Sequence, residues 1–468
     1  MLRIIIIKEL LNNITGLRFV LALSISLAVF TVGGFVFVSR YDLELQEFYE
    51  ETSRNLSGLN ESSMNLSQLA NHEQTIHRNP KITWLFCEGF ERTLPNSFKL
   101  DVFALQIPDV TGATNFLLPQ CVDIDWMFVI TLILSFFAIL LTFDTFSGER
   151  ERGTLPLSLS NSIPRDLLIT GKYIGAVLTL AIPLFFGMLL NLIIVNLSGF
   201  QFDSGQWQKI AAFVTVSLLY LSIFLFSGML VSSRSSKSST SIVISLFVWI
   251  VLVVLIPATG KIISEKFIRV PSRTEVDRMI HEAQTEIWDN SERYGKNAGS
   301  WGSNLNADWI NPPARARLYN ALTDAINRIN EDYINRIMEQ VNLGRRMTKV
   351  SPAIIYQTLS EKIFGTGVPR LQSMHNQIKT YKNVLRNFLI EEDKKDPDSW
   401  HLLAWRHPII FSQKPVDFNT IPKFQETDQS VGNALGSALW DITALILINI
   451  FLFTAVFVSF LRGDVRQR

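Results

Sequence analysis

The sequence has 468 residues, of which 48% are hydrophobic and only 18% are charged, and it contains 33 phenylalanines. Its formal net charge of +1 gives no overall attraction to nucleic acid. Its apolar residues gather in long blocks, which argues against one large soluble core. Composition therefore indicates an all-α membrane protein with inserts outside the membrane.

The chain begins with an amphipathic stretch followed by an apolar one. Residues 1–13 place Lys8 and Glu9 among Ile and Leu, which predicts a helix on the membrane surface. The run Ile4–Ile7 is too short for the apolar region of a signal peptide, and no small-residue cleavage site follows the next apolar segment. We therefore expect the first span to be retained, in a unit covering residues 1–38.

Six segments approach the roughly 20 apolar residues needed to cross a bilayer. They are 17–38, 125–143, 170–198, 208–232, 240–260 and 434–461. Lys and Arg gather beside the span ends that would face one side, whereas the opposite loop 199–206 has none. The positive-inside rule then places both termini in the cytoplasm, with segments 39–124 and 261–433 outside it and a short tail after the last span, within 434–468. Three tryptophans near the outer span ends are predicted to be interfacial anchors: Trp126, Trp207 and Trp440.

The interiors of the spans carry few ionisable side chains. Asp125, Asp144 and Asp441 fall near span ends, while Asn191 and Asn449 are expected to hydrogen-bond between helices. Carriers driven by protons or ions usually need charges at mid-membrane. This pattern argues against secondary transport.

The first outer segment is expected to combine helix and strand. Residues 41–73 carry a broken apolar stripe typical of a helix. Residues 81–86 and 98–107 are predicted strands, the second because apolar residues alternate with Lys99 and Asp101.

The cysteines and histidines lie in the predicted outer segments. Cys87 and Cys121 share the first segment on the oxidising side, which predicts a disulfide, with two unpaired buried thiols as the alternative. No spacing among the histidines matches a metal-ligand set, so no metal site is predicted. These histidines are His72, His77, His281, His375, His401 and His407. No Ser-His-Asp order or carboxylate pair indicates catalysis.

The second outer segment is predicted to be a large helical domain. Apolar residues recur every three or four positions from 314 to 341, and residues 351–364 and 371–392 give two further helices of the same bundle. Residues 297–313 are predicted to form a loop. The aromatic-rich stretch 400–422 is expected either near the membrane surface or against the first outer segment.

The polar island 144–169, between the second and third spans, carries an ordered set of short motifs. They are Glu149-Arg150-Glu151-Arg152, Gly153-Thr154-Leu155, Pro164-Arg165 and, just beyond the island, Gly171-Lys172. The residues alone predict a short amphipathic helix at the membrane surface, beginning near Gly148 and capped by Ser147 or Thr145. On the same side, the Ser-rich stretch 232–241 is interpreted as a flexible basic turn.

The order of these motifs resembles the first cytoplasmic loop of ABC-2 type transporter permeases, roughly E-R-E-x-G-T-L, then P-x-x-R, then G-K. The resemblance is specific over about 140–180 and general over the six-span unit, which includes 125–260. Large inserts after the first and fifth spans resemble a bacterial subgroup with a big helical outer domain. The resemblance implies that this loop docks a separate ABC ATPase. The implied coupling residues are Glu149, Arg150, Glu151, Arg152, Gly153, Thr154, Leu155, Pro164, Arg165 and Lys172.

The resemblance implies no cofactor in this chain. No G-x-x-x-x-G-K-[ST] phosphate loop occurs, so ATP and Mg²⁺ would be bound by the partner ATPase. The first hypothesis is an exporter permease of the bacterial inner membrane, with two permease subunits, identical or different, and two ATPase subunits. The second is a mechanical or signalling assembly that acts on an extracytoplasmic partner without moving a substrate.

Overall fold

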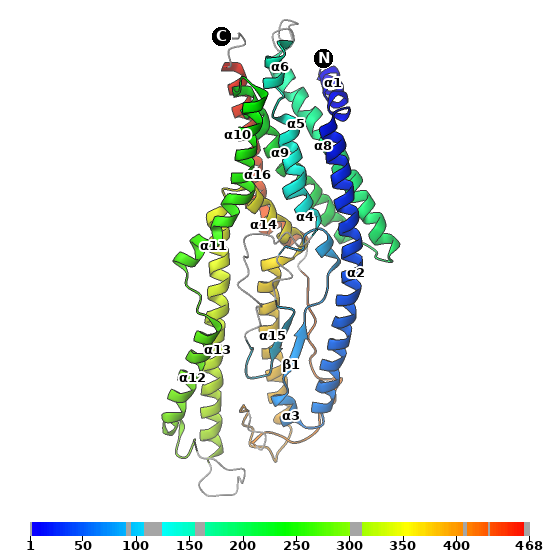
Figure 1. Ribbon diagram of the computed structural model, residues 1–468. Coiled ribbons are helices and arrows are strands. Elements are labelled where there is room, and N and C mark those ends of the chain that lie inside the picture. The colour runs from blue at the N-terminus through cyan, green and yellow to red at the C-terminus, as the bar shows by residue number, and fades with distance from the viewer. Residues whose placement is uncertain are drawn as a thin grey trace.

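The computed structural model describes residues 2–89, 95–106, 124–154, 164–299, 311–405, 410–428 and 431–462. Long helices run along one axis, and β1 and α3 lie in the half of the molecule away from both termini (Figure 1). In chain order the elements are α1 (Leu2–Ile14), α2 (Leu17–Ser62), α3 (Leu66–Asn71), β1 (Gln74–His77), the 3₁₀ helix η1 (Ile82–Leu85), β2 (Ser97–Leu100), α4 (Trp126–Phe128), the π-helical η3 (Val129–Leu134), α5 (Ser135–Thr142), α6 (Ser147–Glu151), α8 (Arg165–Leu197), α9 (Ser204–Arg234), α10 (Ser238–Ile250), the π-helical η4 (Val251–Leu255), α11 (Ile256–Phe267), α12 (Arg273–Asp289), the 3₁₀ helix η5 (Ser291–Tyr294), α13 (Pro312–Thr348), α14 (Pro352–Phe364), α15 (Gly367–Asp393) and α16 (Val431–Arg462).

Among the described residues, six helical stretches are long and apolar enough to cross a membrane, which confirms the predicted spans. They are Leu17–Ser62, Trp126–Glu151, Arg165–Leu197, Ser204–Arg234, Ser238–Phe267 and Gly436–Arg462. Helices α1 and α6 and the last turn of α16 lie together at one end, here called the loop end (Figure 1). The second and fifth spans each contain a π-helical stretch, η3 and η4.

Helix α2 extends well past the membrane. Its 46 residues measure about 70 Å at 1.5 Å per residue, more than twice the hydrocarbon thickness. The predicted span 17–38 and most of the predicted helix 41–73 are therefore one continuous helix, which ends at Ser62.

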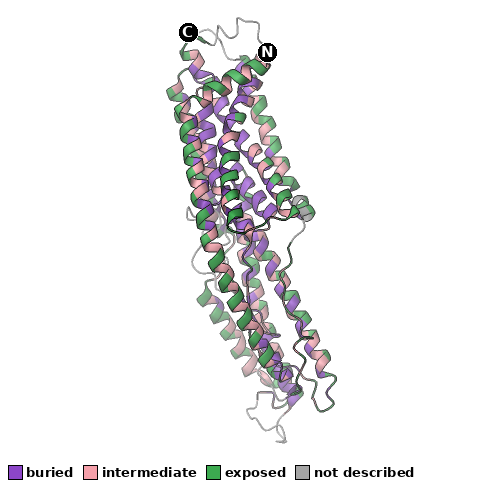
Figure 2. Cartoon of the chain, turned by 90° about the vertical axis from the view of Figure 1, so that its right-hand side faces the viewer, coloured by how far each residue is buried: buried purple, intermediate pink, exposed green. Residues whose placement is uncertain are grey.

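Buried residues line the middle of the bundle of spans, and exposed ones cover its outside (Figure 2). The Asn191 amide donates to the carbonyl of Phe30 at 2.6 Å and accepts from the Trp126 indole at 2.9 Å. Asn449 donates to the carbonyl of Leu219 at 3.0 Å. Both asparagines thus bond between helices, as predicted. Trp126, only 1% exposed, is not the interfacial anchor expected, because its ring and indole N–H are held inside the protein.

A second body, here called the extramembrane domain, joins the C-terminal half of α2 to α3, β1, β2, α12, α13, α15 and the strap 410–428. Strands β1 and β2 pair antiparallel, with Gln74 opposite Leu100. The strap binds the first outer segment, since Leu66 donates to the carbonyl of Lys414 at 3.0 Å and Val416 donates to that of Ser63 at 2.8 Å. For the described residues of the strap, this confirms the expectation that the stretch 400–422 packs against the first outer segment.

The two strand predictions were partly wrong. Residues 82–85 form the 3₁₀ helix η1, because the consecutive residues Thr83–Cys87 are all buried, and a strand would point alternate ones outward. The second strand ends at Leu100. The Asp101 carboxylate accepts from the amides of Phe103 and Ala104 at 2.7 Å each and turns the chain.

The helix predicted over 351–364 exists as α14, but its surroundings differ from the expectation. It packs against α9 and α16 and shares one apolar cluster with the spans. Its Tyr356 stacks on Tyr220 of α9 with ring centroids 4.5 Å apart, and the two hydroxyls of Tyr356 and Ser217 lie 2.8 Å apart. Phe364 stacks on Phe86 at 4.9 Å. Helix α14 is therefore the junction between the spans and the extramembrane domain.

A buried ion pair holds this junction. The Arg345 guanidinium of α13 meets both carboxylate oxygens of Glu361 on α14 at 2.7 and 3.0 Å, and Glu361 is fully buried. Two glycines with left-handed backbone approach the same carboxylate. A Cβ on Gly89 would lie 3.1 Å from Glu361 Oε1, and one on Gly367 would lie 2.7 Å from its Cδ.

Replacing Glu361 with Gln should therefore destabilise the protein by about 3–5 kcal/mol, because Arg345 would be left charged and buried. The loss is measured by thermal unfolding of the full chain in detergent. The matched control is Arg336→Gln, which breaks the exposed pair with Asp332 on the same helix and should cost less than about 1 kcal/mol. Equal losses in the two variants would contradict this account of the junction.

The strap is fixed by a second charge cluster. The Glu426 carboxylate accepts two hydrogen bonds from Arg370 at 2.8 Å and lies 2.9 Å from Lys81 Nζ. Burial alone would raise the pKa of Glu426, but the hydrogen bonds and charges of Arg370 and Lys81 outweigh it and lower that pKa to about 2.

This lowered pKa makes the contribution of Glu426 depend on pH. Its stabilisation should be fully present above the ordinary pKa of 4.5 and be lost as pH falls toward 2. Glu426→Gln should thus cost on the order of 3 kcal/mol at neutral pH, and the gap to wild type should narrow below about pH 4.5. Unfolding midpoints across pH test this, with the exposed Glu282→Gln on α12 as control. A gap that stays constant down to the lowest pH would count against it.

Candidate coupling surface

Helix α6 forms the last turn of the stretch Trp126–Glu151 and begins at Ser147, close to the predicted start. Its first amides are not capped by Ser147 or Thr145, as was expected. Instead, the N–H groups of Phe146 and Ser147 both donate to Ser232 Oγ on α9, at 2.9 and 3.0 Å. The Ser147 hydroxyl is used elsewhere, because it donates to the carbonyl of Phe143 at 3.1 Å. The start of α6 is thus fixed by another helix.

The Ser-rich stretch 232–241 binds α6 and is not the flexible turn that was predicted. Arg150 donates to the carbonyls of Ser233 and Ser235 at 3.1 and 2.6 Å. Glu151 accepts from the amide and hydroxyl of Ser238 at 3.2 and 2.8 Å. Among the hydroxyl groups of the described serines in this stretch, only those of Ser232 and Ser238 bind α6. Serines at 233, 236 and 239 have the same spacing, so the sequence carries no signal that distinguishes these two.

Lys172 lies at the centre of the loop end. Its ammonium is 2.7 Å from Glu9 of α1 and 2.7 Å from Glu149 of α6, and its side chain is only 4% exposed. Helix α1 packs closely on α8 here, because a Cβ on Gly171 would lie 2.6 Å from Ile5 and one on Gly175 would lie 2.8 Å from Glu9. The Gly-Lys motif therefore ties α1, α6 and α8 together.

A further ion pair that the sequence did not reveal joins the first span to the loop. Arg18 meets both carboxylate oxygens of Asp144 at 3.0 and 2.9 Å and also donates to the carbonyl of Leu140 at 3.2 Å. Its guanidinium carbon lies 4.5 Å from the centroid of the Phe143 ring.

The remaining motif residues face outward. Glu151, Arg152, Gly153, Thr154 and Pro164 are exposed. Gly153 has φ +70°, and no atom of the described residues lies within 4 Å of where its Cβ would be. Arg165 is half-buried and donates to the carbonyl of Leu461 at 3.0 Å, which ties the start of α8 to the end of α16. Leu155 and the rest of 155–163 lie outside the described residues.

The candidate coupling residues therefore fall into two sets. Glu149, Arg150 and Lys172 hold α6 in place through contacts within the chain. Arg152, Gly153 and Thr154 lie on the surface beside them. A fixed helix with charged and polar residues on its open side can bind another protein in one orientation.

The other sequence-predicted sites gain no support as chemical centres. Cys87 is buried with its sulfur 3.6 Å from that of Met127, while Cys121 lies outside the described residues, so the disulfide stays a prediction. Over the part of the chain that the structure describes, no three His, Cys, Asp or Glu residues are grouped to hold a metal. His407 lies outside that part.

Comparison of the amino-acid sequence with known proteins identifies a family. The sequence model of the family described as ABC-2 family transporter protein matches residues 3–465. The probable ABC transporter permease protein NosY of Stutzerimonas stutzeri is 28% identical over 127 residues, and that of Pseudomonas aeruginosa is 32% identical over 129. Each alignment covers 27% of this chain and 46% of the relative, so the chain spans about half the length of these relatives.

Replacing Lys172 with Met should leave Glu9 and Glu149 facing each other without their shared cation, at a cost of about 3 kcal/mol. Adding Glu9→Gln and Glu149→Gln should recover most of the loss, because no buried charge then lacks a partner. Thermal unfolding in detergent measures both effects. Lys261→Met, which removes a partly exposed cation near Glu265, is the control. A loss no larger than that of the control, or no recovery in the triple variant, would refute the role assigned to Lys172.

Proposed function

The chain belongs to the ABC-2 transporter family, and from that premise we propose that it is a permease subunit whose energy comes from a separate ATPase. The observation that carries the proposal is the loop end. There a five-residue helix is fixed by α1, α8, α9 and α10 and leaves a short charged segment open. Multi-pass membrane subunits of this kind bind no nucleotide themselves, so ATP and Mg²⁺ belong to the partner.

We assign ATPase docking to the exposed residues Glu151, Arg152, Gly153, Thr154 and Pro164, together with Leu155. Arg152 carries its charge on an exposed side chain. Glu149 and Lys172 act from behind, by keeping α6 in one orientation relative to α8. Charged groups at the edge of such an interface set the register and the rate of association.

Movement of the ATPase would reach the extramembrane domain through α9. Its cytoplasmic end accepts the first amides of α6 at Ser232, and further along it contacts α14 through Ser217 and Tyr220. Helix α14 in turn is fixed to α13 by Glu361. A displacement of α6 is therefore expected to shift packed elements whose contacts run from one end of the protein to the other.

Family membership and the distribution of charge support the assembly that we propose. Two permease subunits, identical or different, would pair with two ATPase subunits in the bacterial inner membrane. Cations near the loop end favour a cytoplasmic location for that end, with the extramembrane domain in the periplasm. Export of a substrate is the function that this arrangement supports best.

A second candidate function is favoured by α14. This helix fills the end of the bundle with Tyr356 and Phe364 and connects it to the large domain. ATP hydrolysis could then rearrange the domain against an extracytoplasmic partner, with no substrate crossing the membrane.

The first experiment is affinity purification of the full chain from its native membrane in mild detergent, with assay of ATP hydrolysis. Arg152→Glu should reduce the recovered ATPase about tenfold, because the charge reversal opposes docking. Lys8→Glu, an exposed cation on α1 at the same end, should change it little. Recovery of no ATPase with wild type, or equal recovery with both variants, would remove the basis for the docking surface.

Reconstitution in vesicles separates the two functions. If the protein is an exporter, the vesicles should show ATP-dependent movement of solute across their membrane when the solutes that they contain are varied. A rate of ATP hydrolysis that does not depend on the solutes in the vesicles, but rises when a periplasmic extract is added, would support the mechanical assembly. It would exclude obligatory export.

A further inference from the structure

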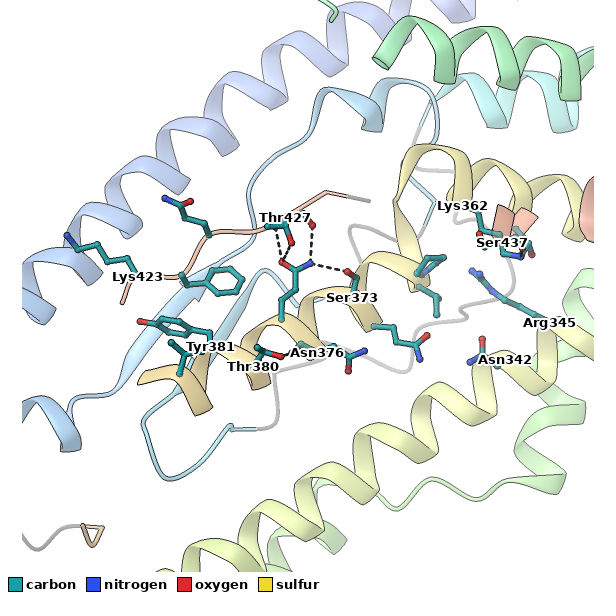
Figure 3. A pocket seen from close by; sticks show the side chains of 18 of the residues that line it. Asn342, Arg345, Lys362, Ser373, Asn376, Thr380, Tyr381, Lys423, Thr427 and Ser437 are labelled. Atoms are coloured by element: carbon teal, nitrogen blue, oxygen red, sulfur yellow. Dashed lines mark hydrogen bonds between the residues drawn. The ribbon is translucent and has the colours of Figure 1, made fainter. Parts of the chain in front are cut away.

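A cavity of about 850 Å³ opens in the extramembrane domain between α13, α15 and the strap (Figure 3). It begins near Ser437, at the start of the last span, and follows α15 from Val368 to Val384. The sixteen steps from the first to the last of these residues correspond to about 24 Å of helix. The cavity is therefore long, and one end lies at the level where the chain enters the membrane.

All charged side chains among the described residues that line the cavity are cationic. Five cations line it: Arg345, Arg346, Lys349, Lys362 and Lys423. None of its described lining residues is Asp or Glu. Glu361, paired with Arg345, and Asp441, shared by Lys349 and Lys362, lie behind the wall and offset two of the five charges. A surplus of three positive charges remains.

Between the charges, the wall of α15 is polar but neutral. Gln372, Asn376 and Thr380 lie four residues apart on one face of the helix, and Asn342 faces them from α13 (Figure 3). The side-chain amides of Gln372, Asn376 and Asn342 make no hydrogen bond with any residue in the described ranges. These groups can donate to and accept from hydroxyl groups of a ligand.

The wall is held in shape by other residues. Gln377 accepts from the amide of Thr427 at 2.8 Å and donates to its carbonyl at 3.0 Å. The Tyr381 hydroxyl donates to the Gln74 amide oxygen at 2.8 Å, and the Tyr381 and Phe424 rings meet edge to face at the far end. The strap is thus fastened to α15, and the cavity exists before any ligand arrives, as most small-molecule sites do.

We propose that this cavity binds an elongated, hydroxyl-rich anion, of the class of acidic saccharides and anionic lipid head groups. Arg346 and Lys423 attract the anionic groups, since neither forms an ion pair with a residue that the structure describes. The amides of α15 and α13 bind the hydroxyls. Lys423 lies 3.9 Å from the centroid of the Phe418 ring, which positions its ammonium. The site does not depend on the ATPase, because every contributing residue belongs to this chain.

The test uses the full chain in nanodiscs without nucleotide, so its outcome is independent of the coupling surface. Soluble tetragalacturonate is titrated by calorimetry in phosphatidylcholine nanodiscs, with maltotetraose as the neutral counterpart. In a second arm, native mass spectrometry compares retained phosphatidylglycerol with retained phosphatidylcholine. Binding of the soluble acid points to a free saccharide, and retention of phosphatidylglycerol alone points to a lipid of the outer leaflet; either result supports the site.

Arg346→Gln and Lys423→Gln should each weaken binding about threefold to tenfold, and the double variant about tenfold to a hundredfold, because both charges are exposed to the ligand and the two losses add in free energy. Arg328→Gln removes an exposed cation of α13 that does not line the cavity and should have no effect. The proposal is overturned if no anionic probe binds, if maltotetraose binds as well as the acid, or if the double variant binds like wild type.

Discussion

The fold depends on a charge that is expensive to bury. Glu361 has no exposed surface, and Arg345 is the cation that satisfies it. Such a pair adds little net stability compared with apolar residues, but it defines geometry strictly, because any other arrangement leaves a charge unpaired. The left-handed Gly367, just after α14, and the left-handed Gly89, from the first outer segment, both lie against the same carboxylate. One segment distant in sequence and two neighbouring turns therefore meet at Glu361, and this meeting point helps to fix the position of α14.

The π-helical stretches serve the same junction. Single π-helical turns inside α-helices occur frequently at functional sites. In the second span, the carbonyl of Thr131 accepts from the Tyr220 hydroxyl at 3.1 Å. In the fifth, the carbonyl of Leu252 accepts from Ser351 at the start of α14. Tyr220 also stacks on Tyr356, so two irregular spans and α14 share one set of contacts. These irregularities lie where the membrane part meets the extramembrane domain.

Hydropathy was sufficient to find the six spans, because an apolar run of that length has few alternatives. The loop motif likewise located α6. Contacts between distant residues were less predictable. Ser232 looked like part of a soft turn, and only the tertiary structure shows that it receives two amides. The composition of α14 is that of an ordinary helix in a domain. The position of Trp126 near a span end is typical of an interfacial residue. Both are buried because they contact residues far away in the sequence. The hydrophobic periodicity of a segment does not identify such contacts.

The length of α2 has a consequence for how far movements spread. A helix of 46 residues without a break behaves as a single stiff arm of about 70 Å, and its first turns carry Arg18, bound to the loop end through Asp144. If that end pivots by about 5°, the far tip at Ser62 is carried sideways by about 6 Å, as follows from the length of the arm. A small displacement near the Arg18–Asp144 pair is thus magnified severalfold at the other end of α2. The strap is hydrogen-bonded to the chain there, through Val416 and Ser63.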